Sequence, residues 1–304
     1  MATSNMNREC GPMPERMESR ECVQPSLQDL RPTFLNDLIR VGPGCDGGYV
    51  VNERSVLRSQ YLMSFGVNDD WSFELAFLDR KPDVKVFCYD YSVSKSVFRH
   101  QMLDALNEVL SLRFLLVVLL LNLSGIRERF SWLKNRARNY RGFSDFIAKE
   151  NVRFYEKGLS NEKTARFVTF AEAFQSMSSD PIPDNSVFVK MDIEQFEFRV
   201  LPDLLKFDRY INGLAIEFHD LDILWPRFVE LMDKLKADFE VTHIHGNNWS
   251  GLIPNTGVPT VLEITLLKRS LIREERSDCK TVTYPIPQLD YPNKSSEKDY
   301  PLVF

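Results

Sequence analysis

Eleven residues of the chain, numbers 64–74, constrain its fold most, because they join an apolar segment to a helix through a tight turn. They read SFGVNDDWSFE and are followed by AFL, an apolar segment suited to opening a helix. Gly66 has no side chain, so a ligand can approach the backbone there. Asp69, Asp70 and Glu74 add negative charge, whereas a phosphate-binding loop needs hydrogen-bond donors. The turn therefore favours a neutral or cationic ligand over a pyrophosphate.

A second predicted strand, residues 86–88, carries Asp90 at its carboxyl end. A carboxylate in that place typically accepts hydrogen bonds from a pair of ribose hydroxyls. The G-x-G-x-x-G of dinucleotide sites is absent, so Gly66 and Asp90 together indicate an adenosyl ligand without phosphates, S-adenosyl-L-methionine. An ordinary strand-to-helix connection and a helix N-cap are the alternative interpretation of the same residues. The candidate cofactor-binding residues are Phe65, Gly66, Val67, Asp69, Glu74, Asp90 and Asp192.

Three further apolar segments end in polar, hydrogen-bonding residues. Residues 186–194 end in Asp192 and Glu194, and residues 213–222 carry Glu217, His219 and Asp220. Residues 239–250 repeat the pattern with His243, His245, Asn247 and Asn248. The carboxyl ends of parallel strands share one edge of the sheet, where ligands of open α/β sheets bind. We therefore expect an α/β fold with a polar cluster at that edge.

These segments resemble the FkbM-like family of S-adenosylmethionine-dependent methyltransferases. The resemblance is carried by DGGYVV at 46–51, by SFGVNDDWSFE, by VKMDIEQFEFRVL, and by EFHDLD with HIHGNN, and it covers roughly residues 41–267. It implies a Rossmann-like class I methyltransferase fold, with a seven-stranded, mostly parallel sheet and an antiparallel last strand. It also implies O-methylation of a saccharide or small molecule, as in polysaccharide biosynthesis. One position departs from the family, which usually has glycine where this chain has Gln195.

Transfer of a methyl group to a hydroxyl requires a base as well as an aligned nucleophile. His219 is the expected base, because imidazole titrates near neutral pH, and His245 is the second choice. Asp192 is expected to position the acceptor or the methionine amine of the cofactor. We expect a structural role for His243. No metal is favoured, but Mg²⁺ held by Asp192, Glu217 and His219 is an alternative, since hard oxygen ligands suit this ion.

The chain is expected to hold one catalytic domain. Residues 27–275 are assigned to it, with a helical insertion at about 93–143 after the second strand. Residues 1–26 read as a mobile leader and residues 276–304 as an irregular tail. The glycines of residues 46–48 are typical of a hairpin turn, and a place in the pocket lining is the alternative. Five scattered cysteines without a C-x-x-C pair favour reduced thiols, a cytoplasmic setting and no zinc.

An apolar run at residues 114–123, FLLVVLLLNL, precedes a basic segment. The run is about half the length of a membrane span, so we expect no transmembrane segment but a helix buried against the sheet or between copies in a homo-oligomer. Residues 127–141 concentrate Arg127, Arg129, Lys134, Arg136, Arg138 and Arg141. A solvated helix face is the ordinary interpretation, and contact with an anionic ligand or a membrane surface is the alternative.

The sequence thus predicts a methyltransferase that acts on oxygen in a saccharide or small-molecule acceptor. A Rossmann-like binding protein without catalysis is the alternative from another class, and Gln195 is its only indication. A nucleic-acid methyltransferase is disfavoured, because the net charge of −5 argues against general nucleic-acid binding and no N/D-P-P-Y/F motif is present.

Overall fold

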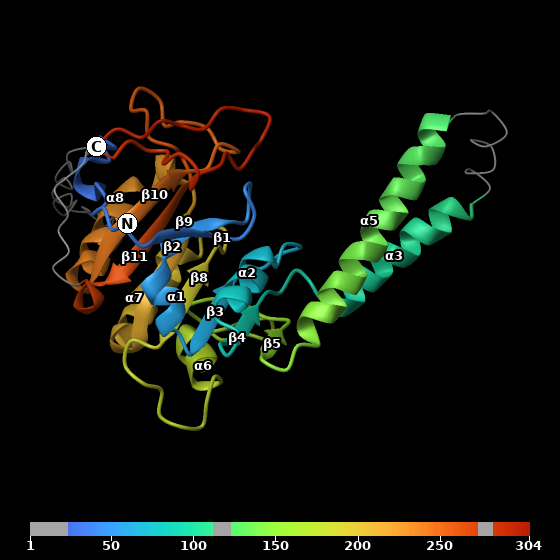
Figure 1. The fold of residues 1–304 in the computed structure, drawn as a ribbon, viewed down its shortest axis with the longest axis horizontal. Helices are drawn as coiled ribbons and strands as arrows, with labels where there is room; N and C mark the ends of the chain where they lie inside the picture. The colour runs from blue at the N-terminus through green and yellow to red at the C-terminus, as the bar shows by residue number, and fades with distance from the viewer. Residues whose placement is uncertain (1–23, 112–122, 273–281) are drawn as a thin grey trace, which may run out of the picture.

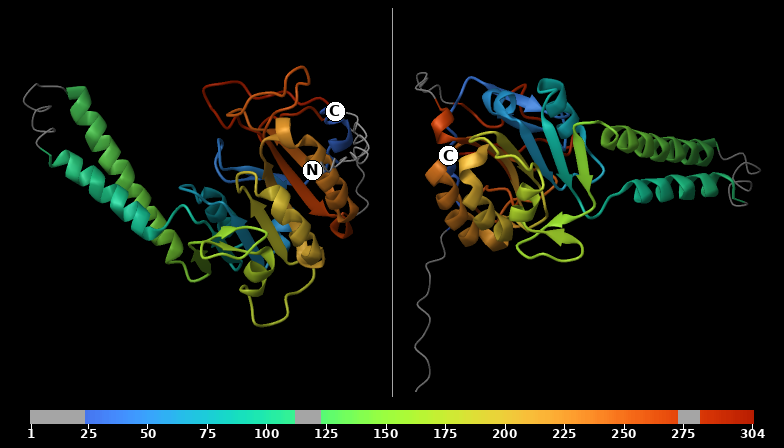
Figure 2. Two further views of the ribbon diagram at one scale, coloured as in Figure 1. Left: turned by 180° about the vertical axis from the view of Figure 1, so that it is seen from behind. Right: turned by 90° about the horizontal axis from the view of Figure 1, so that it is seen from below.

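A single seven-stranded sheet with helices on both faces forms the body of the protein (Figures 1 and 2). The computed structural model describes residues 24–111, 123–272 and 282–304. The expected leader therefore lies outside the described residues, apart from residues 24–26. Two long helices project from one side of the body.

The strand order of the sheet is β10-β11-β9-β8-β3-β4-β5. All neighbouring strands are parallel except β11, which runs antiparallel to both β10 and β9. The strands are β3 (Tyr61–Phe65), β4 (Lys85–Tyr89), β5 (Val152–Tyr155), β8 (Val187–Met191), β9 (Ile211–Phe218), β10 (Phe239–Gly246) and β11 (Leu262–Lys268). This arrangement confirms the predicted mostly parallel sheet with its antiparallel last strand. The chain moves outward from β3 to β5 and then returns to β8, so the order reverses between β3 and β8.

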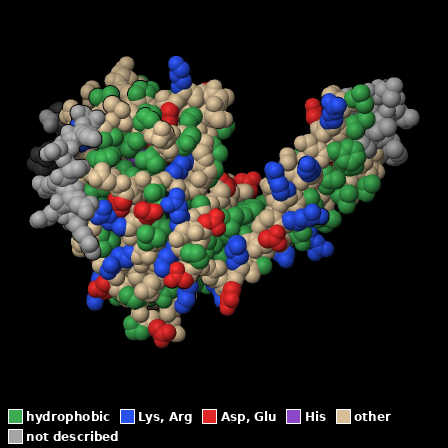
Figure 3. Space-filling view, viewed as in Figure 1, with side chains coloured by type: hydrophobic (Ala, Val, Ile, Leu, Met, Phe, Trp, Pro, Cys, Tyr) green, Lys and Arg blue, Asp and Glu red, His purple; other side chains and the backbone are tan. Residues whose placement is uncertain are grey.

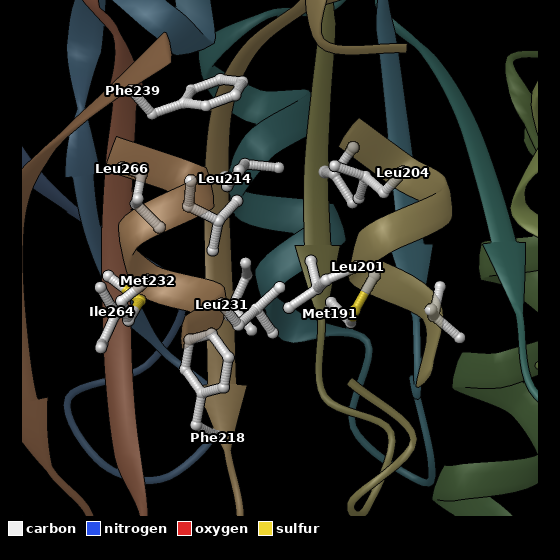
Figure 4. Packing of buried hydrophobic residues seen from close by; sticks show 14 of the residues in the cluster. Met191, Leu201, Leu204, Leu214, Phe218, Leu231, Met232, Phe239, Ile264 and Leu266 are labelled. Carbon is white, nitrogen blue, oxygen red and sulfur yellow. The ribbon is translucent and has the colours of Figure 1, made fainter. Parts of the chain in front are cut away.

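Both faces of the sheet are covered, which is why its strands read as continuous apolar runs. Successive side chains of a strand point to opposite faces. In β3, Met63 and Phe65 belong to the core on one face, whereas Leu62 belongs to the core on the other. Figure 4 shows part of the first core, where Met191 of β8 lies beside Leu201 and Leu214 of β9 belongs to the same cluster. Full burial of such a side chain contributes about 1.5–3 kcal/mol to folding.

Short helices follow the strands and cover the two faces. They are α1 (Glu53–Arg58), α2 (Ser72–Arg80), α6 (Phe170–Gln175), α7 (Glu197–Leu204) and α8 (Leu221–Asp238), with 3-10 turns η1 (Gln28–Leu30), η2 (Leu205–Tyr210) and η3 (Arg269–Leu271). Thr169 and Glu172 form a reciprocal capping box that fixes the start of α6. The amphipathic α8 buries Leu221, Phe228 and Leu235 along one side.

An antiparallel hairpin of β1 (Leu38–Val41) and β2 (Tyr49–Asn52) lies near the N-terminus. Its turn contains Gly47 at φ +82°, as the hairpin interpretation of residues 46–48 requires. Thr265 of β11 donates to the carbonyl of Val50 at 2.6 Å and thereby fastens the hairpin to the main sheet. The glycines of the turn do not line the cavity described below.

The expected helical insertion is an antiparallel pair of helices, α3 (Lys95–Val109) and α5 (Leu123–Ile147), which extends away from the sheet (Figures 1 and 2). Of the apolar run at 114–123, only Leu123 is described, so its predicted burial lies outside the described residues. Over the described ranges, no helix combines the length and apolarity that crossing a membrane demands.

Residues 282–304 form no helix or strand beyond an isolated bridge between Tyr284 and Leu302. They cross the carboxyl end of β10, where Asn248 accepts from the backbone N–H of Lys294 at 2.7 Å. This segment also supplies Asp290 and Asp299 to the polar residues of β10.

Candidate functional site

A cavity of about 410 Å³ opens at the carboxyl ends of β3, β4 and β8. This is the point where the strand order reverses, the usual place for a ligand in an open α/β sheet. Its lining consists of residues from these strand ends and from the pair β6 (Gly158–Leu159) and β7 (Phe167–Val168): Gly66, Asn68, Tyr89, Asp90, Tyr91, Ser92, Gly158, Leu159, Phe167, Asp192, Ile193, Glu194 and Phe196.

A larger cavity of about 690 Å³ lies elsewhere, beside α1 and Asn185. Asn185 directly precedes β8, so this cavity is at the amino end of the strand. Two of its charged side chains, Arg54 and Asp37, pair with each other at 2.6 Å. The polar residues that follow the strands are absent from its lining, so the smaller cavity is the candidate site.

Gly66 has a conformation and an environment that only glycine tolerates. Its φ is +78°, and an added Cβ would lie 1.6 Å from the carbonyl oxygen of Asp192. The sequence suggested that a ligand approaches the backbone here. The structure shows that the backbone of the neighbouring loop makes the close approach, while Gly66 still borders the cavity.

Asp90 connects the two loops at the mouth of the cavity. One carboxylate oxygen accepts from the backbone N–H of Asn68 at 2.8 Å, and the other accepts from the N–H and hydroxyl of Ser92 at 2.7 and 2.6 Å. A carboxylate has about four acceptor positions and three are used here, so Asp90 retains capacity for about one ligand hydroxyl. It is held as a preorganised acceptor on the cavity wall.

The other candidate cofactor residues do not line the cavity. Phe65 and Val67 are buried in the two cores, and Asp69 is exposed. Glu74 is buried behind β3, where it accepts from the hydroxyl of Ser64. Burial raises the pKa of its carboxyl, and nearby Lys190 partly opposes this rise.

Aromatic side chains that the sequence did not predict also line the cavity. The rings of Tyr91 and Phe167 lie 5.1 Å apart, and the rings of Phe167 and Phe196 stack at 5.7 Å. Pairing of β6 with β7 places Phe167 there. Such a wall suits the flat face of a purine. No sequence signal pointed to it, because β6 and β7 have only two residues each.

Lys190 lies beneath the cavity, inside the apolar strand β8. Its ammonium donates to the carbonyl of Gly66 at 2.8 Å and lies 3.6 Å from Asp192. Burial alone lowers the pKa of Lys190, but the charges of Asp192 and Glu74 outweigh it and leave the pKa raised. A lysine within a buried strand is rare unless paired, and this is the signal that could have identified it.

Four carboxylates surround His219. Its Nδ1 is 3.2 Å from Glu197, and its Nε2 is 3.4 Å from Glu217 and 3.7 Å from both Asp192 and Glu194. The structure therefore brings together Asp192, Glu217 and His219, as the sequence suggested. Glu197 was not foreseen. We call these five residues the acidic cluster.

The environment of the acidic cluster favours bound protons. Burial lowers the pKa of His219, but hydrogen bonds to Glu197 and Glu217 outweigh this effect and raise the pKa to about 11. Burial and the charge of Asp192 raise the pKa of Glu217 to about 8. At neutral pH His219 is therefore an imidazolium, and an imidazolium accepts no further proton.

Two hairpin and loop residues complete the surroundings of Glu217. The hydroxyl of Tyr49 donates to Glu217 at 3.3 Å, and the amide of Asn247 donates to it at 3.1 Å. Tyr49 belongs to the DGGYVV segment, so this motif contributes a side chain to the acidic cluster although its glycines form the turn.

Asp192, Glu217 and His219 each offer a ligand atom, and these atoms lie within 4.8 Å of one another. Two carboxylates and an imidazole could hold a hard divalent cation. Asp220 takes no part in this group and lies at the start of α8, with φ +53°.

His245 and His243 lie away from the cavity. His245 lies between Glu263 at 3.2 Å and Asp299 at 2.9 Å. Burial lowers the pKa of His245, but these carboxylates outweigh it and raise the pKa to about 10. His243 pairs with Asp290 at 3.0 Å. Both rings connect β10 to the C-terminal segment, and neither lines the cavity.

Gln195 occupies a left-handed turn, with φ +74°. Glycine adopts such a conformation without steric cost, which explains the glycine expected here from the resemblance. The flanking residues Glu194 and Phe196 line the cavity, whereas Gln195 does not. The side chain of Gln195 is therefore not part of the cavity wall.

Comparison with known proteins gives distant likenesses. No protein-family description and no curated protein matches the sequence. Among solved structures, a precorrin-6y C5,15-methyltransferase from Geobacter metallireducens is 13% identical, covers 71% of this chain and 86% of its own, and gives a TM-score of 0.32. A putative S-adenosylmethionine-dependent methyltransferase from Listeria monocytogenes is 10% identical over 70% of this chain and 93% of its own, with a TM-score of 0.33. The fold assignment rests on the strand order and not on these likenesses.

Proposed function

We propose that this protein is an S-adenosylmethionine-dependent methyltransferase of the FkbM-like type that methylates a hydroxyl oxygen of a saccharide or other small molecule. One observation carries the proposal: Gly66, Asp90 and Asp192, which come from three different strand ends, line the same cavity. The seven-stranded sheet with its single reversed strand supports the class, and the left-handed turn at Gln195 supports the family resemblance.

The cavity residues suit an adenosyl ligand. Asp90 offers a preorganised acceptor to a ribose hydroxyl, and the aromatic wall of Tyr91, Phe167 and Phe196 offers a stacking surface to adenine. Asp192 and Glu194 add negative charge to the lining, which suits the cationic methionine part. Bound there, S-adenosylmethionine would supply an activated methyl group.

The acidic cluster takes the acceptor proton. When the hydroxyl oxygen bonds to the methyl carbon, its proton must pass to a base. His219 was the expected base, but its proton is already bound at neutral pH. We therefore assign proton acceptance to Asp192, which lines the cavity, and make His219 the charged positioning residue behind it. A base of this kind contributes about 10²–10⁴ in rate.

Calorimetry and a turnover assay together test the proposal. The purified chain should bind S-adenosylhomocysteine, and release of this product from S-adenosylmethionine should depend on an added polyol or saccharide acceptor. Absence of binding at millimolar ligand would refute the methyltransferase assignment. Binding without turnover on any hydroxyl acceptor would instead support a binding protein without catalysis.

A further inference from the structure

The α3–α5 hairpin is a separate arm fixed to the body at one end. At its base, Trp71 of the body packs edge-on against Phe98 of α3 and Phe143 of α5, at 5.8 and 5.4 Å. Farther out, Arg129 pairs with Glu108 at 3.3 Å and joins the two helices. With about 1.5 Å of rise per residue, the 25 residues of α5 are about 37 Å long. The two helices are therefore joined at the base and farther out, and they project from the body (Figure 1).

A basic stripe follows the outer side of α5. Arg127, Lys134, Arg138 and Arg141 are spaced by seven, four and three residues, which places them on one face of the helix. All four are exposed, and within the described part of the chain none of them forms an ion pair. Phe130, which is 51% exposed, lies on the same face. The protein as a whole is acidic, so this stripe concentrates its free positive charge.

A leucine stripe follows α3. Leu103, Leu106 and Leu110 are spaced by three and four residues and are 37%, 39% and 71% exposed. Leu123, at the outer end of α5, is 68% exposed. Figure 3 shows basic and hydrophobic side chains next to one another on the same side of the arm. The arm thus presents an amphipathic surface whose most exposed apolar residues are at its far end.

We propose that the α3–α5 arm docks the protein peripherally on an anionic lipid bilayer. The basic stripe would contact the acidic headgroups, and the leucines at the far end would enter the interface between headgroups and acyl chains. Between Leu110 and Leu123 the sequence reads SLRFLLVVLLLN, which is mostly apolar like the two flanking leucines. The docking surface goes beyond the proposed methyl transfer and does not depend on it.

The combination of charge and leucine favours a bilayer over other partners. Nucleic acid would contact the basic stripe, but it would gain little from three exposed leucines. A second copy of the chain would cover the leucines, but it would bring its own basic stripe into the same interface, and like charges repel. An anionic bilayer can bind the basic stripe through its headgroups and bury the leucines at the same time.

Vesicle flotation of the full chain tests the proposal. The first variant, Lys134→Gln with Arg138→Gln and Arg141→Gln, removes charge from the arm. The second, Leu103→Gln with Leu106→Gln and Leu110→Gln, removes apolar surface, and glutamine preserves helix propensity in both. The matched control removes three exposed lysines of the body, Lys163, Lys206 and Lys234, by change to glutamine. Circular dichroism reports whether each variant keeps its helices.

The wild type should float with vesicles of phosphatidylcholine and phosphatidylserine and not with phosphatidylcholine alone, and added salt should weaken this binding. Loss of three charges should lower the partition coefficient about a hundredfold, at roughly fivefold per charge. Loss of the leucines should lower it at least about tenfold, whereas the control should match the wild type.

Two outcomes would overturn the proposal. If the wild type shows no preference for phosphatidylserine vesicles, no variant is needed to reject it. If the leucine variant floats like the wild type, the surface is purely electrostatic and fits a soluble acidic partner or a nucleic acid. If the wild type does not float, light scattering without lipid tests whether the leucines form a dimer interface instead. In that case the wild type would be a dimer and the leucine variant a monomer.

Discussion

Replacement of Asp90 by asparagine tests the cofactor site at its best-defined contact. In the wild type, both carboxylate oxygens accept hydrogen bonds, from the backbone N–H of Asn68 on one side and from Ser92 on the other. An asparagine amide supplies one oxygen and one NH₂ group. Whichever way the amide is turned, its NH₂ faces one of these donors, and one loop contact is lost.

The magnitude follows from the number of contacts that change. A hydrogen bond to a charged group contributes about 1.5–3 kcal/mol, compared with about 1 kcal/mol for a neutral one. One ribose hydroxyl would therefore lose about 1 kcal/mol, and the displaced loop contact adds about 1 kcal/mol. The total of about 2 kcal/mol corresponds to a roughly 30-fold weaker dissociation constant.

Isothermal titration with S-adenosylhomocysteine measures this change, and Asp69→Asn is the matched control. Asp69 lies in the same loop and undergoes the same chemical change, but it is exposed and does not line the cavity. We expect its variant to bind like the wild type. Equal affinity of Asp90→Asn and the wild type, with a folded loop, would refute the assignment of Asp90 to the ribose.

Three further predictions concern stability, the turn and a metal. Because the pKa of His245 is raised from 6.5 to about 10 in the folded protein, the stabilisation from its bound proton is complete below pH 6.5 and is lost as the pH rises towards 10. Urea titrations should show that the free energy of unfolding falls by at most about 5 kcal/mol over this window. In His245→Gln this dependence on pH should be weaker. Gln195→Gly should leave affinity for S-adenosylhomocysteine unchanged in calorimetry, because the side chain does not line the cavity, and weaker binding would show that it reaches the ligand. EDTA should leave turnover unchanged, because Lys190 and the protonated His219 already supply positive charge at Asp192; loss of activity that Mg²⁺ restores would instead assign an ion to Asp192, Glu217 and His219.

The sheet could be predicted because its evidence is local. Each apolar segment ends in polar residues within a few positions, as Asp192 does after β8, and a parallel sheet collects such ends at one edge. The number of strands and the antiparallel last strand required more than periodicity, since they came from the resemblance to a methyltransferase family. The turn at Gly47 was also readable, because glycine is the usual residue for hairpin turns.

The contacts inside the site could not be predicted, because they join residues that are far apart in the sequence. Tyr49 reaches Glu217 from the N-terminal hairpin, and Asp299 reaches His245 from the C-terminal segment. Glu197 of α7 and Asp299 of the C-terminal segment are distant partners of this kind, and they help to raise the pKa values of His219 and His245. The choice of His219 as base relied on the ordinary pKa of imidazole, whereas hydrogen bonds to Glu197 and Glu217 outweigh the effect of burial and raise its pKa.

The charge of the site also bears on the acceptor. Asp192 and Glu194 line the cavity, whereas the two cations beside Asp192, Lys190 and the protonated His219, are not part of the lining. Two like charges about 4 Å apart repel by about 4 kcal/mol at an effective dielectric constant near 20. A phosphate at the reacting end of an acceptor would meet this repulsion, whereas the hydroxyls of a neutral sugar would find hydrogen-bond acceptors. We therefore expect methylation of an uncharged polyol group, and any anionic part of the acceptor must lie away from the acidic cluster.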